Sequence, residues 1–526
     1  MTVLTCMPIL SRIEMIIEDI PRINARKYPN KTAVVFQNTR YTFKELNDRI
    51  NSLANALTSL GLEKGDRIAV IADNCNQHLE MFWVAVKTGM VTLTPNPALS
   101  QQELSYLINN AGARAIIFGQ NYRELVESLR PQLKDVKDYI EIGSSGKGAR
   151  SYEELISSHP PTELGINIDD NDLLALPCTS GTTGLPKQVM ISYRNALVTV
   201  LQLLHAYDAK EKDIFLYLAP AFWTWTLPMV TICSFYLGCT LVIARDMTPP
   251  SILEITEKEG ITNVWTATAL VSELIDYPDL DKYDYRSLRR VVAAGASLPV
   301  EAWRRAVDIF GNIFIIGYGI AECGYLSFLF PEDFIFEGSP EKTKRIRSCG
   351  KETIHVEIRV VDEQDNDVQP GQLGEVIVRG NAMMRGYWNA PKATQEAIKG
   401  GYFYTGDLAT VDEEGYIYLS GRKKDVITSQ GKMLIPSEIE DIIYRNPQVL
   451  ETAVIGVPDR ELGEAVKAIV VLKKGGEASK DEIIELCQHH LPAYAVPKSA
   501  DFIERLPRNP SGKILRYVLH EKYAQS

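Results

Sequence analysis

Short apolar runs alternate with amphipathic stretches along the first 345 residues. Residues 42–61 carry apolar side chains at positions 46, 50, 53, 57 and 60, which is the spacing of one helix face. Apolar runs of strand length lie on either side of it, at 31–36, 66–72, 90–96 and 113–119. This alternation predicts an α/β fold in which parallel sheets are covered by helices, in a doubly wound arrangement.

The alternation resumes after residue 190, with apolar runs at 213–219, 239–244, 263–268, 289–295 and 312–319. One stretch, 214–244, has no charged residue and is long enough to span a bilayer. Pro220, Pro228 and Gly238 interrupt it. We therefore expect a strand, a loop, a buried helix and a second strand, and no stable membrane span.

Beyond about residue 345 the pattern changes to strands separated by turns, at 355–368, 374–380 and 415–421, which predicts a small β-barrel-like subdomain at about 345–420. The segment GRKKD at 421–425 has neither a helix nor a strand pattern, and about a hundred residues of α+β character follow it. We place a domain boundary there. The large N-terminal domain, 1–421, would hold two sheets and the β-rich subdomain, and a small α+β domain would cover 422–526.

Composition and charge narrow the class of protein. The chain has 526 residues, 45% of them hydrophobic and 23% charged, so it is an ordinary globular protein of two or more domains. A formal net charge of -11 disfavours nucleic acid and anionic membrane surfaces as partners. Arg12 and Glu14 interrupt any apolar leader, which favours a cytoplasmic protein.

Cysteine and histidine spacings give no metal or disulfide pattern. The eight cysteines show no C-x-x-C spacing and lie mostly in apolar runs, so we expect reduced structural thiols. The seven histidines show no H-x-x-x-H or H-x-E spacing. A metal site built by the protein alone is therefore not expected.

The stretch LPCTSGTTGLPKQVM, residues 176–190, has the composition of an anion-binding loop. Glycines let backbone N–H groups approach a phosphate, hydroxyls add donors, and a lysine adds positive charge. The spacing is not that of a P-loop NTPase, because the two glycines are three residues apart and Gln188 stands where a hydroxyl should be. Taken alone, such a loop is more often an ordinary surface loop.

Four further motifs follow this loop in order: GYGIAE at 317–322, GYFYTGD at 401–407, GRKKD at 421–425 and LPRNPSGKILR at 506–516. Together the five segments resemble the adenylate-forming superfamily, which includes acyl- and aryl-CoA ligases, luciferases and the adenylation domains of peptide synthetases. The resemblance runs from about residue 25 to residue 520. This ordered set is far more specific than any one glycine-rich loop.

The resemblance implies a two-step reaction. A carboxylate attacks the α-phosphate of ATP to give an acyl-adenylate and pyrophosphate, and the acyl group then passes to the thiol of coenzyme A. AMP is a good leaving group where oxide is a poor one, so the protein has to add positioning and charge neutralisation. The implied cofactors and substrates are ATP, Mg²⁺, coenzyme A and a carboxylic acid.

The resemblance also assigns residues by their place in the motifs. Glu322 would ligate Mg²⁺, with Thr183 acting through the phosphates; Tyr318 would stack on adenine, and Asp407 would accept hydrogen bonds from the ribose. The full set implied for ATP and AMP is Thr179, Ser180, Gly181, Thr182, Thr183, Gly184, Lys187, Gly317, Tyr318, Ala321, Asp407 and Arg422.

The C-terminal motifs imply a catalytic lysine and a moving domain. Lys513 would reach the α-phosphate as charge builds in the adenylation transition state, with Thr183 and Glu322 as the other catalytic residues. Family members rotate their small C-terminal domain between the two half-reactions. Lys424 matches the hinge position, and Gln430, Gly431 and Lys432 match the residues beside the thiol tunnel.

The chain departs from the family pattern at four positions. Gln188 replaces a glycine, Tyr193 a histidine, Ala321 a threonine and Gln430 a glycine. The loss of the threonine hydroxyl at position 321 costs roughly 1–2 kcal/mol if that hydroxyl contacts AMP. This change puts the rate in doubt and leaves the type of reaction unchanged.

The region expected to bind the acid contains two indoles and a small-residue wall. The candidates are Trp223, Trp225, Ala294, Gly295 and Gly317, with Trp223 at the family's histidine position. The alternative that one tryptophan only fills the core is equally favoured. No aspartate follows Phe222, so an amino acid is disfavoured, and we favour a medium-chain, alicyclic or aryl acid over a long-chain one.

Two other functions stay open on the sequence. A stand-alone adenylation enzyme could load the phosphopantetheine arm of a carrier protein, or a nucleotide-binding regulator could keep the fold without turnover. The presence of Lys513, Glu322 and Asp407 argues against the regulator, because loss of catalysis usually removes a charged catalytic group. A homodimer also stays open.

Overall fold

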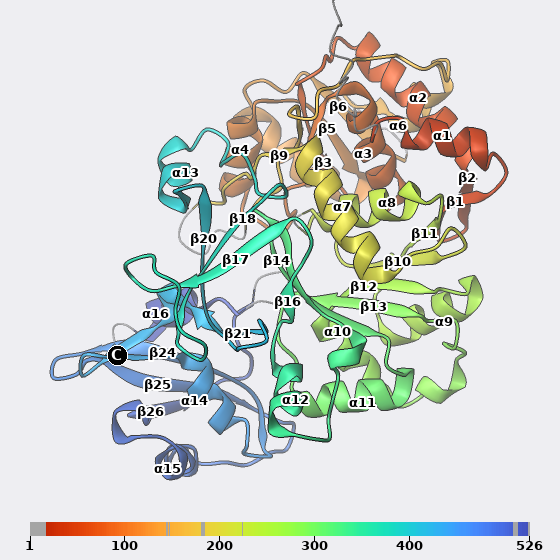
Figure 1. Cartoon of the computed structure of the whole chain (residues 1–526). Helices are drawn as coiled ribbons and strands as arrows, with labels where there is room; N and C mark the ends of the chain where they lie inside the picture. Colours follow the sequence, from red (N-terminus) through yellow and green to blue (C-terminus); the bar gives the residue numbers. More distant parts are fainter. Residues whose placement is uncertain are drawn as a thin grey trace, which may run out of the picture.

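In the described part of the chain, the strands form four sheets (Figure 1). The structure is a computed structural model, and it describes residues 17–143, 146, 148–179, 185–223, 225–508 and 514–523. The predictions for Ser180, Gly181, Thr182, Thr183, Gly184 and Lys513 concern positions outside the described residues.

The first sheet has seven strands and is parallel except for its β8–β9 edge pair. Its order is β7 (Arg150–Ser151), β6 (Asp138–Ile142), β5 (Ala113–Gly119), β3 (Arg67–Ile71), β4 (Val91–Leu93), β8 (Leu173–Ala175) and β9 (Ile191–Ser192). The helices that follow its strands are α3 (Asn76–Thr88), α4 (Gln101–Ala111), α5 (Arg123–Leu129) and α6 (Tyr152–Ser157).

The second sheet has nine strands, with a parallel centre and antiparallel edges. Its order is β16 (Lys351–Glu352), β15 (Gly324–Leu329), β14 (Phe314–Ile320), β13 (Arg290–Ala294), β12 (Asn263–Ala267), β10 (Ile214–Leu218), β11 (Thr240–Ile243), β1 (Thr32–Phe36) and β2 (Thr39–Thr42). Its helices are α1 (Ile20–Lys27), α2 (Phe43–Ser59), α7 (Tyr193–Tyr207), α8 (Thr226–Tyr236), α9 (Pro249–Glu259), α10 (Thr268–Ile275), α11 (Val300–Phe310) and α12 (Pro340–Lys344).

The two sheets share one core. The largest apolar cluster joins α2, α3, α7 and α8 to both sheets, while separate clusters lie on the outer faces, under α4 and α5 of the first sheet and under α9 to α11 of the second. Each sheet is thus covered on both faces, as a doubly wound α/β arrangement requires. The predicted fold class is confirmed.

The charge-free stretch 214–244 forms β10, α8 and β11 in that order. Helix α8 has eleven residues, nearly all of them buried against the two sheets. No helix among the described residues is both long and apolar enough to cross a membrane. Pro220 and Gly238 therefore divide the stretch as the sequence predicts.

The third sheet joins β17 (Val356–Val361), β18 (Gly374–Gly380), β20 (Tyr402–Val411) and β19 (Ile398–Lys399), with β21 (Ile417–Arg422) paired to β20. Helix α13 (Pro391–Ala397) lies in the connection between β18 and β19. The fourth sheet joins β23 (Lys432–Leu434), β22 (Ile427–Ser429), β25 (Gly463–Leu472) and β24 (Val449–Asp459), with β26 (Ser499–Phe502) on β25. It carries α14 (Pro436–Ile443), α15 (Lys480–His490) and α16 (Arg516–Tyr523). In Figure 1 this last unit, in blue, lies below the third sheet.

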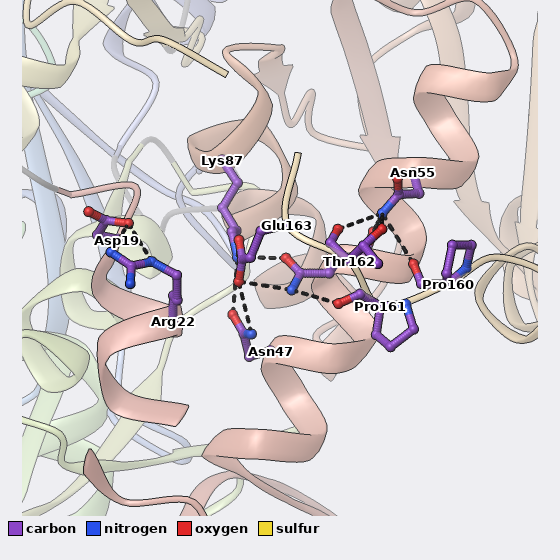
Figure 2. Close-up of polar contacts among 10 residues, drawn as sticks. Asp19, Arg22, Asn47, Asn55, Lys87, Pro160, Pro161, Thr162 and Glu163 are labelled. Atoms are coloured by element: carbon purple, nitrogen blue, oxygen red, sulfur yellow. Dashed lines mark hydrogen bonds and ion pairs between the residues drawn. The ribbon is translucent and has the colours of Figure 1, made fainter. Parts of the chain in front are cut away.

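Helix α2 shows how local sequence sets one of these elements. Thr42 and Glu45 form a capping box at its start, and Leu46, Ile50, Leu53 and Leu57 are buried along one face. On the neighbouring face, asparagines at positions 47, 51 and 55 bind the segment 158–172, here called the strap (Figure 2). The strap leads directly into β8 and so into the predicted phosphate loop.

Candidate active site

Tyr318, Asp407 and Arg422 come together from two sheets. Tyr318 lies near the end of β14, and its hydroxyl donates to Asp407 Oδ2 at 2.6 Å. Arg422 pairs with Asp407 across β20 and β21, and its Nε lies 2.7 Å from Asp407 Oδ1. The carboxyl end of a strand in an open α/β sheet is where ligands bind in such folds. The predicted adenine and ribose residues therefore form one cluster.

This cluster is held in place by its backbone. Asp407 is buried, and its N–H donates to Thr405 Oγ1 at 3.0 Å. Arg422 Nη1 also donates to the carbonyl of Thr405 at 2.9 Å. Burial, and next the Asp407 carboxylate, raise the pKa of Tyr318 well above its ordinary value, so its hydroxyl stays a neutral donor. Each carboxylate oxygen of Asp407 keeps a lone pair for a further donor.

The predicted phosphate loop is closed at its base. The N–H of Thr179 donates to the carbonyl of Lys187 at 2.8 Å, and the N–H of Lys187 donates to Thr179 Oγ1 at 3.2 Å. Cys178 and Gln188 form an antiparallel bridge just outside this pair. The two ends of the loop are therefore fixed, whatever ligand lies between them.

Glu322 and Lys187 meet at a third residue, Tyr387, in the loop between β18 and α13. The hydroxyl of Tyr387 donates to Glu322 Oε1 at 2.8 Å. Lys187 Nζ lies 4.9 Å from the centroid of the Tyr387 ring. The predicted metal ligand and the predicted phosphate-binding lysine thus share one neighbour, which the sequence analysis did not select.

Trp223 lies beside the small-residue wall predicted for the acid. Its ring packs edge-to-face on Trp265 with centroids 5.6 Å apart. A Cβ added at Gly295 would lie 3.2 Å from Trp223 Cη2, so this glycine leaves room for the indole. Ala294 is half-buried at the end of β13. These residues therefore form one aromatic and small-residue wall at the carboxyl edge of the nine-stranded sheet.

The second indole is a core residue. Trp225 is 4% exposed and packs edge-to-face on Phe82 of α3, with centroids 5.9 Å apart. Of the two tryptophans, Trp225 therefore fits the core alternative, and Trp223 is the stronger acid-pocket candidate.

Gly317 faces an aromatic ring instead of open space, because a Cβ there would lie 2.7 Å from Tyr325 Cε1. Tyr325 in turn accepts a hydrogen bond from Trp265 Nε1.

The C-terminal candidates lie on a separate set of elements. Lys424 is exposed in a short 3-10 turn, Lys423–Asp425, between β21 and β22. Gln430 and Gly431 form the two-residue turn of the β22–β23 hairpin, and both have positive φ, of 52° and 70°. Lys432 Nζ lies 3.9 Å from the centroid of the Tyr494 ring.

The chain on either side of Lys513 is anchored. Arg508 and Ile514 form an antiparallel bridge, and Arg508 Nη2 lies 2.7 Å from Glu451 Oε1. Arg516 Nη2 lies 2.6 Å from Glu440 Oε1, and Arg516 Nη1 lies 4.0 Å from Asp425 Oδ2. Asp425 follows the predicted hinge residue, so the base of the lysine loop contacts the hinge segment.

Two of the family departures have structural explanations. Gln188 is 1% exposed; its Oε1 accepts from Asn110 Nδ2 at 2.7 Å and its Nε2 donates to the carbonyl of Leu107 at 3.1 Å. The hydroxyl of Tyr193 donates to the carbonyl of Val86 at 2.8 Å, in the last turn of α3. Ala321 is half-buried after β14, and its replacement of threonine has no structural explanation.

The described cysteines are free, and Cys178, next to the phosphate loop, is held as a thiol because burial raises its pKa to about 12.

Sequence reasoning missed Tyr387, Trp265 and Tyr325. Tyr387 follows Gly386 and precedes Trp388 in a loop after a strand, and such an aromatic pair in a loop was the available signal. Trp265 and Tyr325 lie in ordinary apolar strand patterns, which carry no signal of a site.

Two family models match the chain. The family described as AMP-binding enzyme matches residues 22–388, and the AMP-binding enzyme C-terminal domain matches residues 438–513. A feruloyl-CoA synthase from Amycolatopsis sp is 32% identical over 505 residues, covering 96% of this chain and 98% of that protein.

Two further relatives extend the comparison. The long-chain-fatty-acid–CoA ligase FadD13 from Mycobacterium tuberculosis is 31% identical, with 96% of each chain covered. The crystal structure of the anthranilate CoA ligase AuaEII in complex with anthranoyl-AMP superposes with a TM-score of 0.88 at 26% identity, covering 98% of each chain.

The fold and the matched family models define an adenylate-forming enzyme class. This chain belongs to the AMP-binding enzyme family. Its named relatives are CoA ligases and synthetases, which confirms the predicted class, AMP-forming acid–CoA ligases, at the level of the family. ATP and CoA are substrates of such ligases.

Proposed function

We propose that this chain activates a carboxylic acid with ATP, releases pyrophosphate, and transfers the acyl group from the adenylate to coenzyme A. One observation carries the proposal. Four separate sequence motifs contribute Lys187, Tyr318, Glu322, Asp407 and Arg422 to two adjoining clusters at the end of β14. Because Glu322 follows Tyr318 by only four residues, a single nucleotide can contact both clusters.

Each of the two clusters suits a different part of the nucleotide. The buried Asp407 carboxylate suits the paired hydroxyls of a ribose, and Arg422 orients that carboxylate through their ion pair. Lys187, at the closed base of its loop, suits phosphate oxygens. In this arrangement the α-phosphate lies between the ribose and the β- and γ-phosphates, where Lys513 would stabilise the charge that develops.

Glu322 also fits a magnesium ligand. One of its carboxylate oxygens accepts from Tyr387, and the other is left for a hard cation. No group of three or more His, Cys, Asp or Glu side chains that could hold a metal lies within the described ranges, so a cation here would share Glu322 with phosphate oxygens. When bound, the ion would neutralise phosphate charge and assist departure of pyrophosphate.

An aryl, alicyclic or medium-chain acid suits the predicted pocket. Trp223 lies beside Gly295 and packs edge-to-face on the buried Trp265, and Tyr325 occupies the space next to Gly317. Flat rings stack on such walls with little loss of side-chain freedom. The pocket is thus proposed to be shallow beyond Gly317, which disfavours a long straight chain.

Acid-dependent exchange of pyrophosphate into ATP tests the first half-reaction. The panel should contain short- to long-chain, alicyclic, benzoic, cinnamic and dicarboxylic acids. We expect an aryl, alicyclic or medium-chain acid to give the highest kcat/KM and Lys513→Ala to lower exchange by at least about 100-fold. Lys474→Ala, which removes an exposed lysine elsewhere on the C-terminal unit, is the matched control.

Thioester formation with free CoA tests the second half-reaction. Stoichiometric acyl-CoA with AMP release supports the ligase. Release of the adenylate alone, with no acyl-CoA, would point to a carrier-protein acceptor. Exchange that no acid in the panel stimulates would instead favour a nucleotide-binding regulator.

A further inference from the structure

Tyr387 occupies an unusual position between two opposite charges. Its side chain is 7% exposed, its hydroxyl donates to Glu322 Oε1 at 2.8 Å, and its ring centroid lies 4.9 Å from Lys187 Nζ. The contact of the lysine with the ring is a cation–π interaction, and the contact with Glu322 is a hydrogen bond to a charged acceptor. One side chain therefore touches both groups proposed to hold the triphosphate and its metal.

The backbone fixes Tyr387 in this place from three directions. Tyr387 forms an antiparallel bridge with Val189, two residues after Lys187. Its N–H donates to Thr394 Oγ1 at 2.9 Å, at the start of α13. The N–H of Met384, in the same loop, donates to the carbonyl of Glu322 at 2.6 Å. The loop is thus tied to the chain segments of both charged residues.

Without a spacer, the two charges would neutralise each other. Glu322 is half-buried and Lys187 is exposed, and both contact Tyr387, so without this residue their opposite charges would attract each other directly. Among the described residues, however, no ion pair links Lys187 to Glu322, and each instead contacts Tyr387. A direct pair would remove one acceptor from the cation and one positive charge from the phosphates.

We propose that Tyr387 is a positioning residue that keeps Lys187 and Glu322 apart and directs both toward the metal-bound triphosphate. Its hydroxyl occupies one carboxylate oxygen and orients the other toward the cation. Its ring face holds the ammonium group through a contact that leaves the ammonium hydrogens available to phosphate. This inference rests on the proposed function, because it assigns Tyr387 to the same nucleotide site.

Metal–nucleotide binding to the whole protein tests the role without turnover. Mn²⁺ binding would be measured by electron paramagnetic resonance, with α,β-methylene-ATP as the nucleotide. We expect Tyr387→Phe, which keeps the ring but removes the hydroxyl, to weaken Mn²⁺ binding about 3- to 10-fold, the effect of one net hydrogen bond. Tyr387→Leu should weaken it further, because Lys187 can then close on Glu322.

Tyr418→Phe is the matched control. Tyr418 is 9% exposed, its hydroxyl donates to Asp412 Oδ2 at 2.9 Å, and Lys344 Nζ lies 4.3 Å from its ring centroid. It reproduces the burial, the carboxylate and the cation of Tyr387, but it lies on β21 outside the proposed site. We expect Tyr418→Phe to bind Mn²⁺ and the nucleotide like the wild type.

Steady-state kinetics give a second readout. In Tyr387→Phe the KM for Mg·ATP should rise by a similar factor, whereas the KM for the acid should not change. Wild-type Mn²⁺ affinity in Tyr387→Phe, or equal weakening in Tyr418→Phe, would overturn the positioning role. If Tyr387→Leu does not fold, Tyr387→Phe alone decides the question.

Failure of the proposed function looks different. A wild-type protein that binds Mn²⁺ with the nucleotide but supports no acid-dependent exchange would overturn the ligase assignment, while the comparison of variants still decides the role of Tyr387. A wild-type protein that binds neither would overturn both.

Discussion

At the scale of single residues, a side chain that departs from the family pattern can make structural contacts of its own. Gln188 stands where relatives usually carry glycine, and its buried amide joins the end of the phosphate loop to α4 through Asn110 and Leu107. Trp388 adds a second link, because its N–H donates to the carbonyl of Gln188 at 2.8 Å. The phosphate loop is therefore braced from outside by a side chain that glycine lacks.

We expect Gln188→Gly to destabilise the protein by about 2–4 kcal/mol, since it empties a buried site and leaves Asn110 Nδ2 and the Leu107 carbonyl without their partner. Amide hydrogen exchange of α4 and of residues 185–192 should show the loss locally. Tyr193→Phe, which removes a single buried hydroxyl from the same region, serves as the comparison and should cost about 1 kcal/mol. An unchanged exchange pattern in Gln188→Gly would contradict the bracing role.

Gln430 departs from the family pattern in a way that should lower the stability of its hairpin. With φ of 52° it occupies the first position of a two-residue hairpin turn that favours glycine or asparagine. We expect Gln430→Gly to stabilise the β22–β23 hairpin by about 1 kcal/mol, because it relieves left-handed strain in a non-glycine residue. Slower hydrogen exchange at residues 427–434 would show this. Gly431→Ala, at φ 70°, should speed the same exchange.

At the scale of elements, the strap is the clearest case of a structure held by polar contacts. Asn51 Nδ2 donates to Glu163 Oε1 at 3.0 Å, and Lys87 Nζ, on α3, lies 2.6 Å from Glu163 Oε2 (Figure 2). Asn55 Nδ2 donates to the carbonyl of Thr162 at 2.8 Å. Asparagines spaced four residues apart on α2 therefore bind an extended segment much as a neighbouring strand would.

This binding should depend on pH through Glu163. Burial alone would raise the pKa of Glu163. Hydrogen bonds from Lys87 and Asn51, together with the charge of Lys87, outweigh burial, so the pKa of Glu163 lies below its ordinary value of 4.5. A carboxyl with a lowered folded-state pKa stabilises the folded form above the unfolded-state pKa, and the gain is lost as pH falls through the folded-state value. The strap should therefore open more readily as pH falls below about 4.5.

Glu163→Gln tests this dependence. At pH 7 the variant should open the strap more easily by about 1 kcal/mol, because Lys87 keeps its charge but loses the opposite one. Below pH 4.5 the difference from wild type should shrink, as measured by hydrogen exchange at residues 158–172 after correction for intrinsic rates. Glu477→Gln, an exposed residue on the C-terminal unit, should show no difference at either pH.

The elements themselves could largely be predicted from the sequence. The helix expected at 42–61 is α2, Phe43–Ser59, because its apolar spacing and its capping box agree. The charge-free stretch 214–244 divides at Pro220 and Gly238 as expected, whereas Pro228 lies in the first turn of α8, where a missing N–H costs no helical hydrogen bond. Sheet order could not be predicted, because β1 pairs with β11 and with β2 in the nine-stranded sheet while β3 enters the other one. Local patterns carry no information on such distant pairing.

At the scale of the whole molecule, the residues that the motifs predict for the nucleotide lie together, but the motifs do not include all of their neighbours. Tyr318, Asp407 and Arg422 converge, since a hydrogen bond and an ion pair join residues from two sheets. The aromatic pair at 387–388 was a signal, but the contacts of Tyr387 with Glu322 and Lys187 could not be predicted, because they depend on how the loop after β18 packs. The assignment of Trp225 likewise depended on packing, which the apolar pattern around it does not specify.

The hinge remains a prediction that one substitution can test. Lys424 lies in a short turn between β21 and β22, and Arg516, at the base of the lysine loop, approaches Asp425 beside it. Lys424→Pro fixes φ near −65° and would prevent the large backbone rotation that a hinge requires. We expect it to spare one half-reaction and to slow the other by at least about tenfold.

Separate assays of acid-dependent exchange and of acyl-CoA formation from preformed adenylate would show which step is lost. Lys424→Ala leaves the backbone free and is the control for loss of the charge. Equal effects of Lys424→Pro on both steps would indicate general damage and contradict the hinge assignment.

The pairing of β1 with β11 also bears on how the chain is made. Val34 on β1 pairs with Leu241 on β11, about 200 residues later in the chain. At ribosomal rates of about 5–20 residues per second, β1 waits roughly 10–40 s for its partner strand. During that time an apolar strand, whose residues Ala33 to Phe36 are buried in the finished protein, has an open edge. Chaperone capture of the nascent chain should therefore be strongest before residue 243 emerges, and release should follow synthesis of β11.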